Sequence, residues 1–398
     1  MISTKRNAVT PIVFGVVTIA LVGVPLIQSG WNIDGTVRFL NQFGIFVLIF
    51  ALITLGLNVQ LGYAGISNFG VAGFYLVGAY VAGIFVVPPA TSSYVTYVGG
   101  FLNALNLAPG LRSDQWLPFI VGATASAVAC GLMAAVLALF TPRLRADYLA
   151  IATIGLAEFL RAVTLVQTNL VNGDRGLLGI HSPLDDLVPA PSYPQFYLVL
   201  VAAVLVVLYL AAERSLRSPY GRVLRAMRED EVATAAAGKH LFAFKLQSFI
   251  LGAAIMGIGG AFYAWFSRGL TPSAFEPFQG TFIFWMMLIV GGVGSNLGAL
   301  GGAYIVWGVW VLTLEFQALN LPDVIDSRIP YFRLMFLGVF FIIMLLLRPQ
   351  GLISEEQRVS RWLREKRAVS IVDEAPAVAT ASETVNRVEA GPDGARRG

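Results

Sequence analysis

The chain has 398 residues, of which 57% are hydrophobic and only 13% are charged, and its mean hydropathy is +0.73. Soluble domains carry about 25% charged residues, so a water-soluble fold of this length would lack the charge to cover its surface. The composition excludes soluble enzymes, nucleic-acid binders and disordered scaffolds, and it indicates a protein that lies mainly in membrane lipid. The net charge of +4 is then a topology signal and not the mark of a nucleic-acid partner.

Ten apolar runs follow one another along the chain, and most reach the roughly 20 residues that a membrane-spanning helix needs. They are Pro11–Gln28, Val37–Val59, Phe69–Val87, Trp116–Phe140, Tyr148–Thr168, Gln195–Ala212, Leu246–Ser267, Thr281–Val293, Leu297–Phe316 and Tyr331–Leu347. We therefore predict an all-α integral membrane protein, a polytopic bundle of about ten helices, with eight as the lower bound. The run Thr281–Val293 is short, so we expect it to be a half-helix or to draw on Phe275–Gly280.

The basic residues of the connecting segments fall on one side of the membrane if each run crosses once. They lie at Lys5 and Arg6, at Arg143 and Arg145, between Arg214 and Lys245, and after Arg348. Because cytoplasmic loops are enriched in Lys and Arg, we predict a multi-pass protein with both termini in the cytoplasm. Residues 1–356 form the predicted polytopic transmembrane domain. Residues 357–398 are polar and cannot bury enough apolar area to fold, so we predict a disordered cytoplasmic tail.

Two glycine-rich breaks interrupt the apolar pattern, and both contain Ser-Asn-x-Gly-x-x-Gly. The first break spans residues 62–73 and the second residues 291–301. Paired interruptions in two halves of a transporter favour a translocation pathway, because unwound backbone can line a cavity there. The alternative is that the glycines only let helices pack closely, as at Gly298 and Gly302. The residues predicted to line or gate the pathway are Asn58, Gly62, Tyr63, Gly65, Ser67, Asn68, Gly70, Gly294, Ser295 and Asn296.

A pair of opposite charges, Glu158 and Arg161, lies within the fifth run. A spacing of three residues places both side chains on one helix face, where each offsets part of the other's desolvation cost. An ionisable pair inside a membrane is a functional candidate, so both residues join the predicted substrate pathway. A purely structural ion pair is the alternative.

The segment 213–245 is the long, strongly charged connection between two membrane runs. Ser218 and Pro219 are typical of a helix start, and an amphipathic helix is expected from Tyr220 to Val232, continued to Ala237 and stopped by Gly238. A short helical hairpin that projects into the cytoplasm here would dock a membrane subunit on a soluble motor. A basic loop attracted to anionic lipid head groups is the alternative.

The sequence carries no sign of catalysis. It has no Gly-x-x-x-x-Gly-Lys-Ser/Thr sequence to bind nucleotide phosphates, and its one cysteine, Cys130, excludes an internal disulfide. His181 and His240 lie far apart without partners at ligand spacing. We expect no metal site, no cofactor and no enzymatic activity.

Several of these segments together resemble the LivM-type permeases of the branched-chain amino acid (HAAT) class of ATP-binding cassette (ABC) importers, over roughly residues 40 to 353. The matching segments are the stretch from Leu61 to Gly65 with Gly70 and Phe74 to Tyr80, Thr153 to Arg161, Ser218 to Gly238 with Lys245, and Arg348 to Leu352. The resemblance implies an ATP-driven importer in a bacterial inner membrane. Its implied partners are a second, LivH-like permease, two cytoplasmic ATPase subunits and a periplasmic or extracellular substrate-binding protein.

The resemblance also places the family's coupling helix between Arg222 and Gly238. The residues that it implicates in ATPase coupling are Arg222, Arg225, Arg228, Glu229, Asp230, Glu231 and Gly238. The implied substrate is a branched-chain or related small amino acid. Val71 and Asn68 depart from residues common in the family, and its members also carry urea and short amides, so such a permease is one alternative. An ion-coupled secondary transporter or channel is the other, although it would more often show several buried carboxylates.

Overall fold

We describe a computed structural model over residues 9–28, 31–87, 116–140, 146–185, 187–315 and 328–355. Contacts divide the chain into Met1–Glu355 and Glu356–Gly398, and all described residues belong to the first unit. The predicted disordered tail therefore lies outside the described residues, as do the basic residues Lys5, Arg6, Arg143 and Arg145.

Seven helices of the described chain are long and apolar enough to cross a membrane. They are α1 (Val9–Gln28), α2 (Ile33–Leu57), α5 (Leu117–Phe140), α6 (Ala146–Val166), α8 (Tyr193–Arg217), α11 (Leu241–Ser267) and α13 (Asn296–Glu315). Three shorter apolar helices complete the set: α3 (Val71–Val86), α12 (Ile283–Gly291) with the π-helix η6 (Phe278–Phe282) before it, and α15 (Ile329–Leu347). This confirms the predicted all-α polytopic membrane protein.

The short run Thr281–Val293 is lengthened at its N-terminal end. The π-helix η6 leads directly into α12, so the apolar helix extends over Phe278–Gly291. This extension draws on the residues before Thr281, which was one of the two expected solutions.

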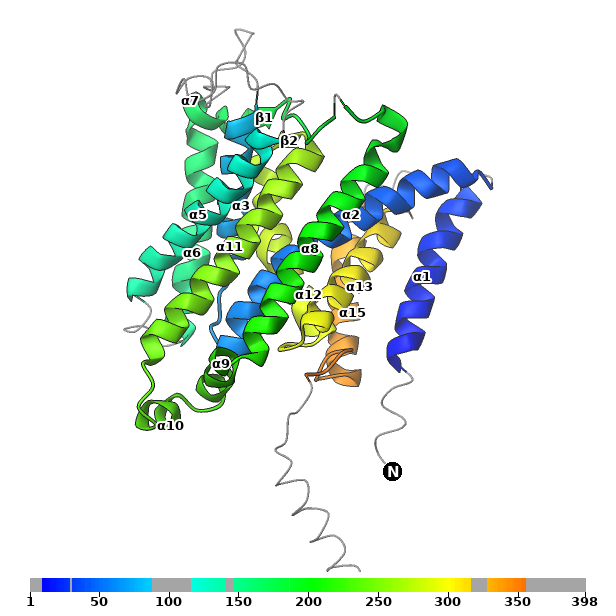
Figure 1. The fold of residues 1–398 in the computed structure, drawn as a ribbon. Coiled ribbons are helices and arrows are strands. Elements are labelled where there is room, and N and C mark those ends of the chain that lie inside the picture. The colour runs from blue at the N-terminus through cyan, green and yellow to red at the C-terminus, as the bar shows by residue number, and fades with distance from the viewer. Residues whose placement is uncertain are drawn as a thin grey trace, which may run out of the picture. The chain divides into compact units, whose positions relative to one another are not determined.

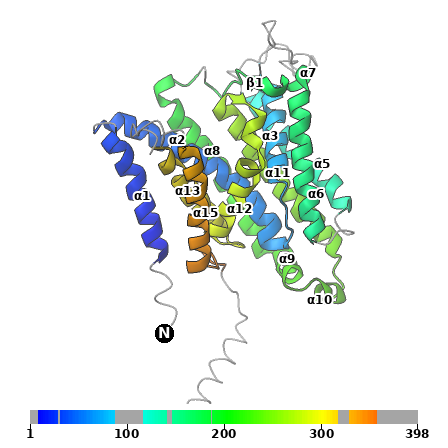
Figure 2. The same ribbon diagram turned by 180° about the vertical axis from the view of Figure 1, so that it is seen from behind.

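The connecting elements lie at two opposite ends of the helices (Figures 1 and 2). One end carries α7 (Thr168–Val171), the 3-10 helices η3 (Gly173–Arg175), η4 (Ala190–Ser192) and η5 (Pro272–Phe275), and two short strands. The strands β1 (Leu177–Leu178) and β2 (Gly269–Leu270) pair antiparallel, with Leu177 opposite Leu270. The other end carries α9 (Pro219–Glu229) and α10 (Glu231–Ala236), and we call it the α9 end.

Helix α11 packs against α2, α3 and α5, and small residues bring it close to α3. A Cβ added at Gly78 would lie 2.5 Å from the Cα of Gly257, and one at Gly260 would lie 2.8 Å from the backbone N of Ala79. Only glycine permits this backbone approach, which is how membrane helices gain dispersion contacts when lipid already solvates their apolar side chains. These glycines, which lie outside the two breaks, therefore serve helix packing.

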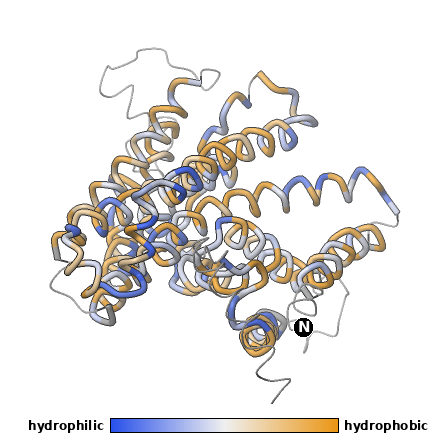
Figure 3. Tube along the Cα trace, turned by 60° about the horizontal axis from the view of Figure 1, so that its bottom comes forward, coloured by the Kyte–Doolittle hydropathy of each residue, from blue (hydrophilic) through white to orange (hydrophobic). Residues whose placement is uncertain are grey.

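Large apolar side chains also point away from the bundle. Ile19 on α1, Val207 on α8 and Leu346 on α15 are each more than 60% exposed. Figure 3 shows long apolar stretches along the helices. Exposed apolar surface on this scale is stable in lipid or against another membrane subunit, but not in water.

Candidate coupling and translocation site

The two glycine-rich breaks meet at the α9 end of the bundle. Helix α2 continues into the π-helix η1 (Asn58–Tyr63) and then into the irregular segment 65–70. In the second break, residues 292–295 form the turn between α12 and α13. The Asn58 side chain bonds two positions of the second break: its Nδ2 donates to Asn296 Oδ1 over 3.0 Å, and its Oδ1 accepts from the Gly294 backbone N over 2.9 Å. Segments more than 230 residues apart are thus joined by one buried amide.

Two further side chains complete this polar cluster around Asn296. The Tyr63 hydroxyl donates to Asn296 Oδ1 over 3.1 Å, and Asn296 Nδ2 donates to Glu213 Oε2 on α8 over 3.0 Å. Glu213 is also paired with Arg217 at 2.9 Å. Sequence reasoning missed Glu213 as a site residue, although a carboxylate directly after the apolar run that ends at Ala212 was a usable signal.

A second set of hydrogen bonds holds the first break against α11. Asn68 Nδ2 donates to Gln60 Oε1 over 2.7 Å, and Gln60 Nε2 donates to the Phe249 carbonyl over 2.8 Å. Asn68 Oδ1 accepts from the Gly70 backbone N over 2.8 Å. The Asn68 amide is fully buried, so its polar atoms are satisfied within the protein instead of facing an open path.

The repeated Ser-Asn pattern therefore performs different roles in the two breaks. Ser295 Oγ accepts from the Gly298 backbone N over 3.1 Å and caps the start of α13. Ser67 is only partly buried. Asn296 bonds across to Asn58 in η1 and to Glu213 on α8, whereas Asn68 bonds within its own segment and to Gln60 in η1. The common sequence pattern marks the two turns but does not assign equivalent contacts to them.

Arg228 on α9 joins both breaks to the C-terminal end of the described chain. Its Nη1 donates to the Gly62 carbonyl, and its Nη2 donates to Glu355 Oε2 over 2.7 Å. Gly65 (φ 69°) and Gly294 (φ 85°) adopt left-handed conformations beside it. A Cβ at Gly294 would lie 2.9 Å from Arg228 Nη1 and 2.6 Å from Glu355 Oε2, so a side chain there would displace the ion pair.

The C-terminal segment is also tied to the second break through its backbone. The backbone N of Leu352 donates to the Val290 carbonyl over 2.9 Å, and that of Ile353 donates to the Gly291 carbonyl over 2.8 Å. Sequence reasoning identified Arg348–Leu352 only through its resemblance to a family. The structure shows that this segment braces the end of α12.

The expected single helix from Tyr220 to Ala237 is wrong, because the chain forms two helices divided at Asp230. Asp230 has an extended backbone (φ −152°, ψ 107°), and its carboxylate accepts from the Ala233 backbone N over 3.0 Å. An aspartate in this geometry is a good N-cap, so it starts α10 instead of continuing α9. Gly238, with φ 74°, follows the end of α10, as expected for a helix stop.

The residues predicted to couple to an ATPase separate into two groups. Arg225 Nη2 donates to the Leu216 carbonyl over 3.1 Å, and Arg228 binds the first break, so these two act inside the protein. The other five residues are exposed at the surface. We call them the coupling surface, and they are Arg222, Glu229, Asp230, Glu231 and Gly238.

The opposite face of α9 is anchored on α11. Leu224 and Met227 are buried, and the Tyr220 ring stacks on Phe244 at 5.7 Å. Burial raises the pKa of the Tyr220 hydroxyl to about 12, so it stays neutral at physiological pH. A helix with one face packed on α11 and the other exposed can transmit a displacement to the membrane helices.

Glu158 and Arg161 form the expected ion pair on α6, with Arg161 Nε 3.0 Å from Glu158 Oε2. The Glu158 side chain is 44% exposed. It lines a small cavity together with Phe69 and Thr281, and so lies beside the first break instead of within the Asn58–Asn296 cluster. No group of three or more His, Cys, Asp or Glu side chains in the described ranges could hold a metal ion.

Comparison with known proteins matches residues 38–345 to the family described as the branched-chain amino acid transport system permease component. A probable branched-chain amino acid transport permease protein LivM of Methanocaldococcus jannaschii is 30% identical over 349 residues, covering 84% of this chain and 98% of that protein. The high-affinity branched-chain amino acid transport system permease protein LivM of Escherichia coli is 30% identical over 329 residues, covering 77% and 68%. No solved structure matches.

Proposed function

The chain belongs to the permease-component family of branched-chain amino acid transport systems, and from this premise we propose that it is one membrane subunit of an ATP-driven importer of branched-chain amino acids. In this proposal the chain pairs with a second permease, two ATPase subunits dock on the coupling surface, and a separate binding protein delivers the substrate. ATP hydrolysis takes place on the partners.

The arrangement of the chain ends supports an orientation with the α9 end in the cytoplasm. Thr10 Oγ1 at the start of α1 donates to the Leu352 carbonyl over 2.9 Å, and Glu355 is paired with Arg228. The start of α1 and the last described residues, 352–355, therefore lie on the side of the basic segment 213–245. By the positive-inside rule this side faces the cytoplasm. The membrane that the importer crosses in this proposal is the bacterial inner membrane.

The connection through Arg228 is the observation that carries the proposed coupling. Arg222 and Glu229 of the coupling surface are exposed on α9, whereas Arg228 on the same helix binds the Gly62 carbonyl in the first break and Glu355 beside the second. When the ATPases close, a shift of α9 would pull on both breaks at once. No comparable contact is needed for a channel that works without a motor.

The polar cluster then forms the closed end of the pathway. Asn58 and Asn296 are at most 3% exposed and satisfy each other, so substrate cannot pass there without their separation. Glu158 and Arg161 present opposite charges beside Phe69, which suits a zwitterionic substrate on its way to the closed end.

Uptake measurements test this proposal. Cells lacking the chain should lose uptake of radiolabelled leucine, isoleucine and valine, and plasmid-borne wild-type chain should restore it. Excess urea or acetamide should not compete. Leucine uptake by the purified chain alone, in vesicles without ATP or partners, would contradict the importer and favour the ion-coupled or channel alternative.

A further inference from the structure

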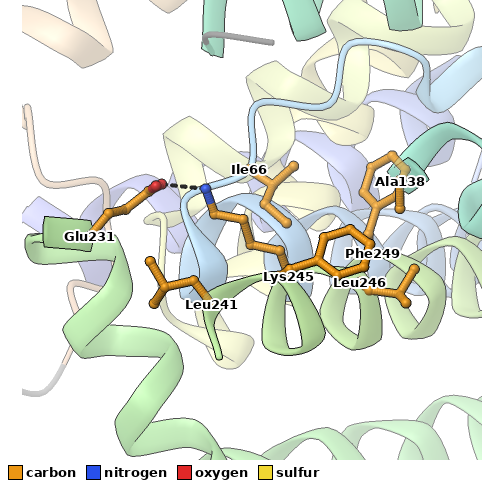
Figure 4. A pocket seen from close by; sticks show the side chains of 8 residues that line it. Ile66, Ala138, Glu231, Leu241, Lys245, Leu246 and Phe249 are labelled. Carbon is orange, nitrogen blue, oxygen red and sulfur yellow. Dashed lines mark hydrogen bonds and ion pairs between the residues drawn. The ribbon is translucent and has the colours of Figure 1, made fainter. Parts of the chain in front are cut away.

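A cavity of about 200 Å³ lies where α10, the first turns of α11 and the first break meet. Its lining includes Ile66, Ala138, Glu231, Lys245 and Phe249. Figure 4 shows Lys245 reaching from α11 toward Glu231 at one end of the pocket, with Phe249 next to Ala138 at the other. Glu231 belongs to the coupling surface and Ile66 to the first break, but no role has been given above to the space between them.

The cavity combines one pair of opposite charges with apolar walls. Lys245 Nζ lies 2.6 Å from Glu231 Oε1, and the two side chains are 24% and 54% exposed. Ile66, Ala138 and Phe249 are at most 5% exposed and carry no charge. A ligand that suits this lining has an anionic group, a cationic group and a compact apolar body.

We propose that the cavity binds one free zwitterionic aliphatic amino acid, the product of transport, on the α9 side of the membrane. The carboxylate would pair with Lys245, the ammonium with Glu231, and the side chain would fill the end formed by Ala138 and Phe249. Drug-sized ligands occupy pockets of about 300–1,000 Å³, so this smaller volume suits an amino acid better than a two-chain phospholipid. The inference rests on the proposed function for the identity of the ligand.

The cavity is positioned to act on the first break. Ile66 belongs to that break, and the Phe249 carbonyl accepts from Gln60, which in turn accepts from Asn68. A ligand that separates Lys245 from Glu231 would also change how α10 sits on α11. Product that accumulates at the α9 end would therefore slow further transport.

Equilibrium binding of radiolabelled leucine to the purified full-length chain tests the site. Lys245→Met removes the carboxylate partner, and Ala138→Phe fills the apolar end while keeping both charges. Each should weaken binding about tenfold or more, the loss expected for a charge-assisted hydrogen bond or a blocked pocket. The matched control is Leu139→Phe, which places the same aromatic ring on the neighbouring residue. That residue is 64% exposed, so the control should leave binding unchanged.

Two results would overturn the inference. One is that the wild-type chain binds no leucine at millimolar concentration. If mass spectrometry then finds a phospholipid on the wild-type chain that both variants lack, the cavity is a lipid site. The other is leucine binding that both variants retain. A transport measurement adds to the binding data. In wild-type cells, unlabelled leucine loaded beforehand should slow the uptake of labelled leucine. With each variant compared with its own uptake from unloaded cells, this slowing should vanish in Ala138→Phe and persist in Leu139→Phe.

The binding measurement needs neither the ATPases nor the binding protein, so it separates this site from the proposed function. If cells lose leucine uptake on deletion of the chain but the purified chain binds no leucine, the site is wrong and the importer stands. If the chain binds leucine through Lys245 but its deletion leaves uptake of branched-chain amino acids unchanged, the importer is wrong and the site stands.

Discussion

Arg228 Nη2 donates to Glu355 Oε2 over 2.7 Å, and this ion pair joins the last turn of α9 to the last described residue of the chain. Both side chains are about three-quarters buried. Because Arg228 also binds the Gly62 carbonyl, a single guanidinium connects the amphipathic helix to the first break and to the segment that braces the second. A displacement of α9 would reach both breaks through this one residue.

Replacing Arg228 by Gln should uncouple the transporter. The change removes the charge-assisted hydrogen bonds to Gly62 and Glu355, each worth about 1.5–3 kcal/mol, so we expect uptake to fall on the order of tenfold or more while ATP hydrolysis continues. Uptake per molecule of ATP hydrolysed in the reconstituted complex measures this. The control is Lys239→Gln, which removes the same charge from an exposed position. Equal loss in both variants would show that charge alone matters.

Gly294→Ala should act on the same ion pair from the other side. A Cβ there would clash with Glu355 Oε2, and φ 85° is strained for alanine by about 1 kcal/mol or more. We expect lower thermal stability and lower uptake. Adding Glu355→Ala should recover part of the stability, because it removes the clash. The control Gly155→Ala, with open space around the new methyl group, should have little effect. Failure of the second change to recover any stability would argue against the clash.

Asn58→Ala should destabilise the closed end of the pathway. It leaves the Gly294 backbone N–H and one oxygen contact of Asn296 unsatisfied, at a cost of about 1–3 kcal/mol. Asn296→Ala should cost a similar amount, and the double variant less than the sum, because the two share a hydrogen bond. Thermal unfolding of the purified variants measures this coupling, with the exposed Asn169→Ala as the control. Simple additivity would mean that the two amides act independently.

Exchanging the charges of Glu158 and Arg161 separates a structural pair from a substrate contact. Glu158→Arg with Arg161→Glu keeps an ion pair on the same helix face, so the chain should still reach the membrane in normal amounts. Leucine uptake should nevertheless stay roughly tenfold lower, since each charge then meets the wrong end of the substrate. Recovery of uptake in the double variant relative to either single variant would identify a purely structural pair.

The acidic part of the coupling surface should be needed by the ATPases. Replacing Glu229, Asp230 and Glu231 together by Ala should uncouple hydrolysis from uptake, measured as uptake per molecule of ATP hydrolysed. This triple change also deletes the N-cap of α10, which costs about 1 kcal/mol. The matched variant therefore combines Glu229→Ala and Glu231→Ala with Asp230→Asn, which keeps a capping oxygen while removing the charge. If the Asn-bearing variant couples normally, the cap and not the charge explains the defect.

Hydropathy predicted most of the architecture. Each apolar run forms an apolar helix, because backbone N–H and C=O groups in lipid must find hydrogen-bond partners within their own segment. The misjudged region was 220–237, where helix-forming residues continue through Asp230. The extended backbone of Asp230 and its bond to Ala233 override that propensity, and no pattern of apolar residues reports on them.

The site was predicted only in part. The glycine-rich breaks and α9 were found from residue type and spacing, whereas Gln60, Glu213 and Glu355 were missed. These three are ordinary polar residues at the edges of apolar or charged segments. Their roles come from hydrogen bonds to residues on other elements, which the sequence does not reveal. Glu213 meets Asn296 across 83 positions, and Glu355 meets Arg228 across 127.

The sequence by itself thus determined that this protein lies in lipid, that the chain crosses the membrane many times, and that it resembles one permease family. These properties depend on composition and on short stretches of residues. Only the tertiary structure decided that the two breaks meet, that Arg228 holds them together with Glu355, and that Asn68 and Asn296 have different partners. Such contacts depend on how distant helices pack, which is a property of the whole chain and not of any segment.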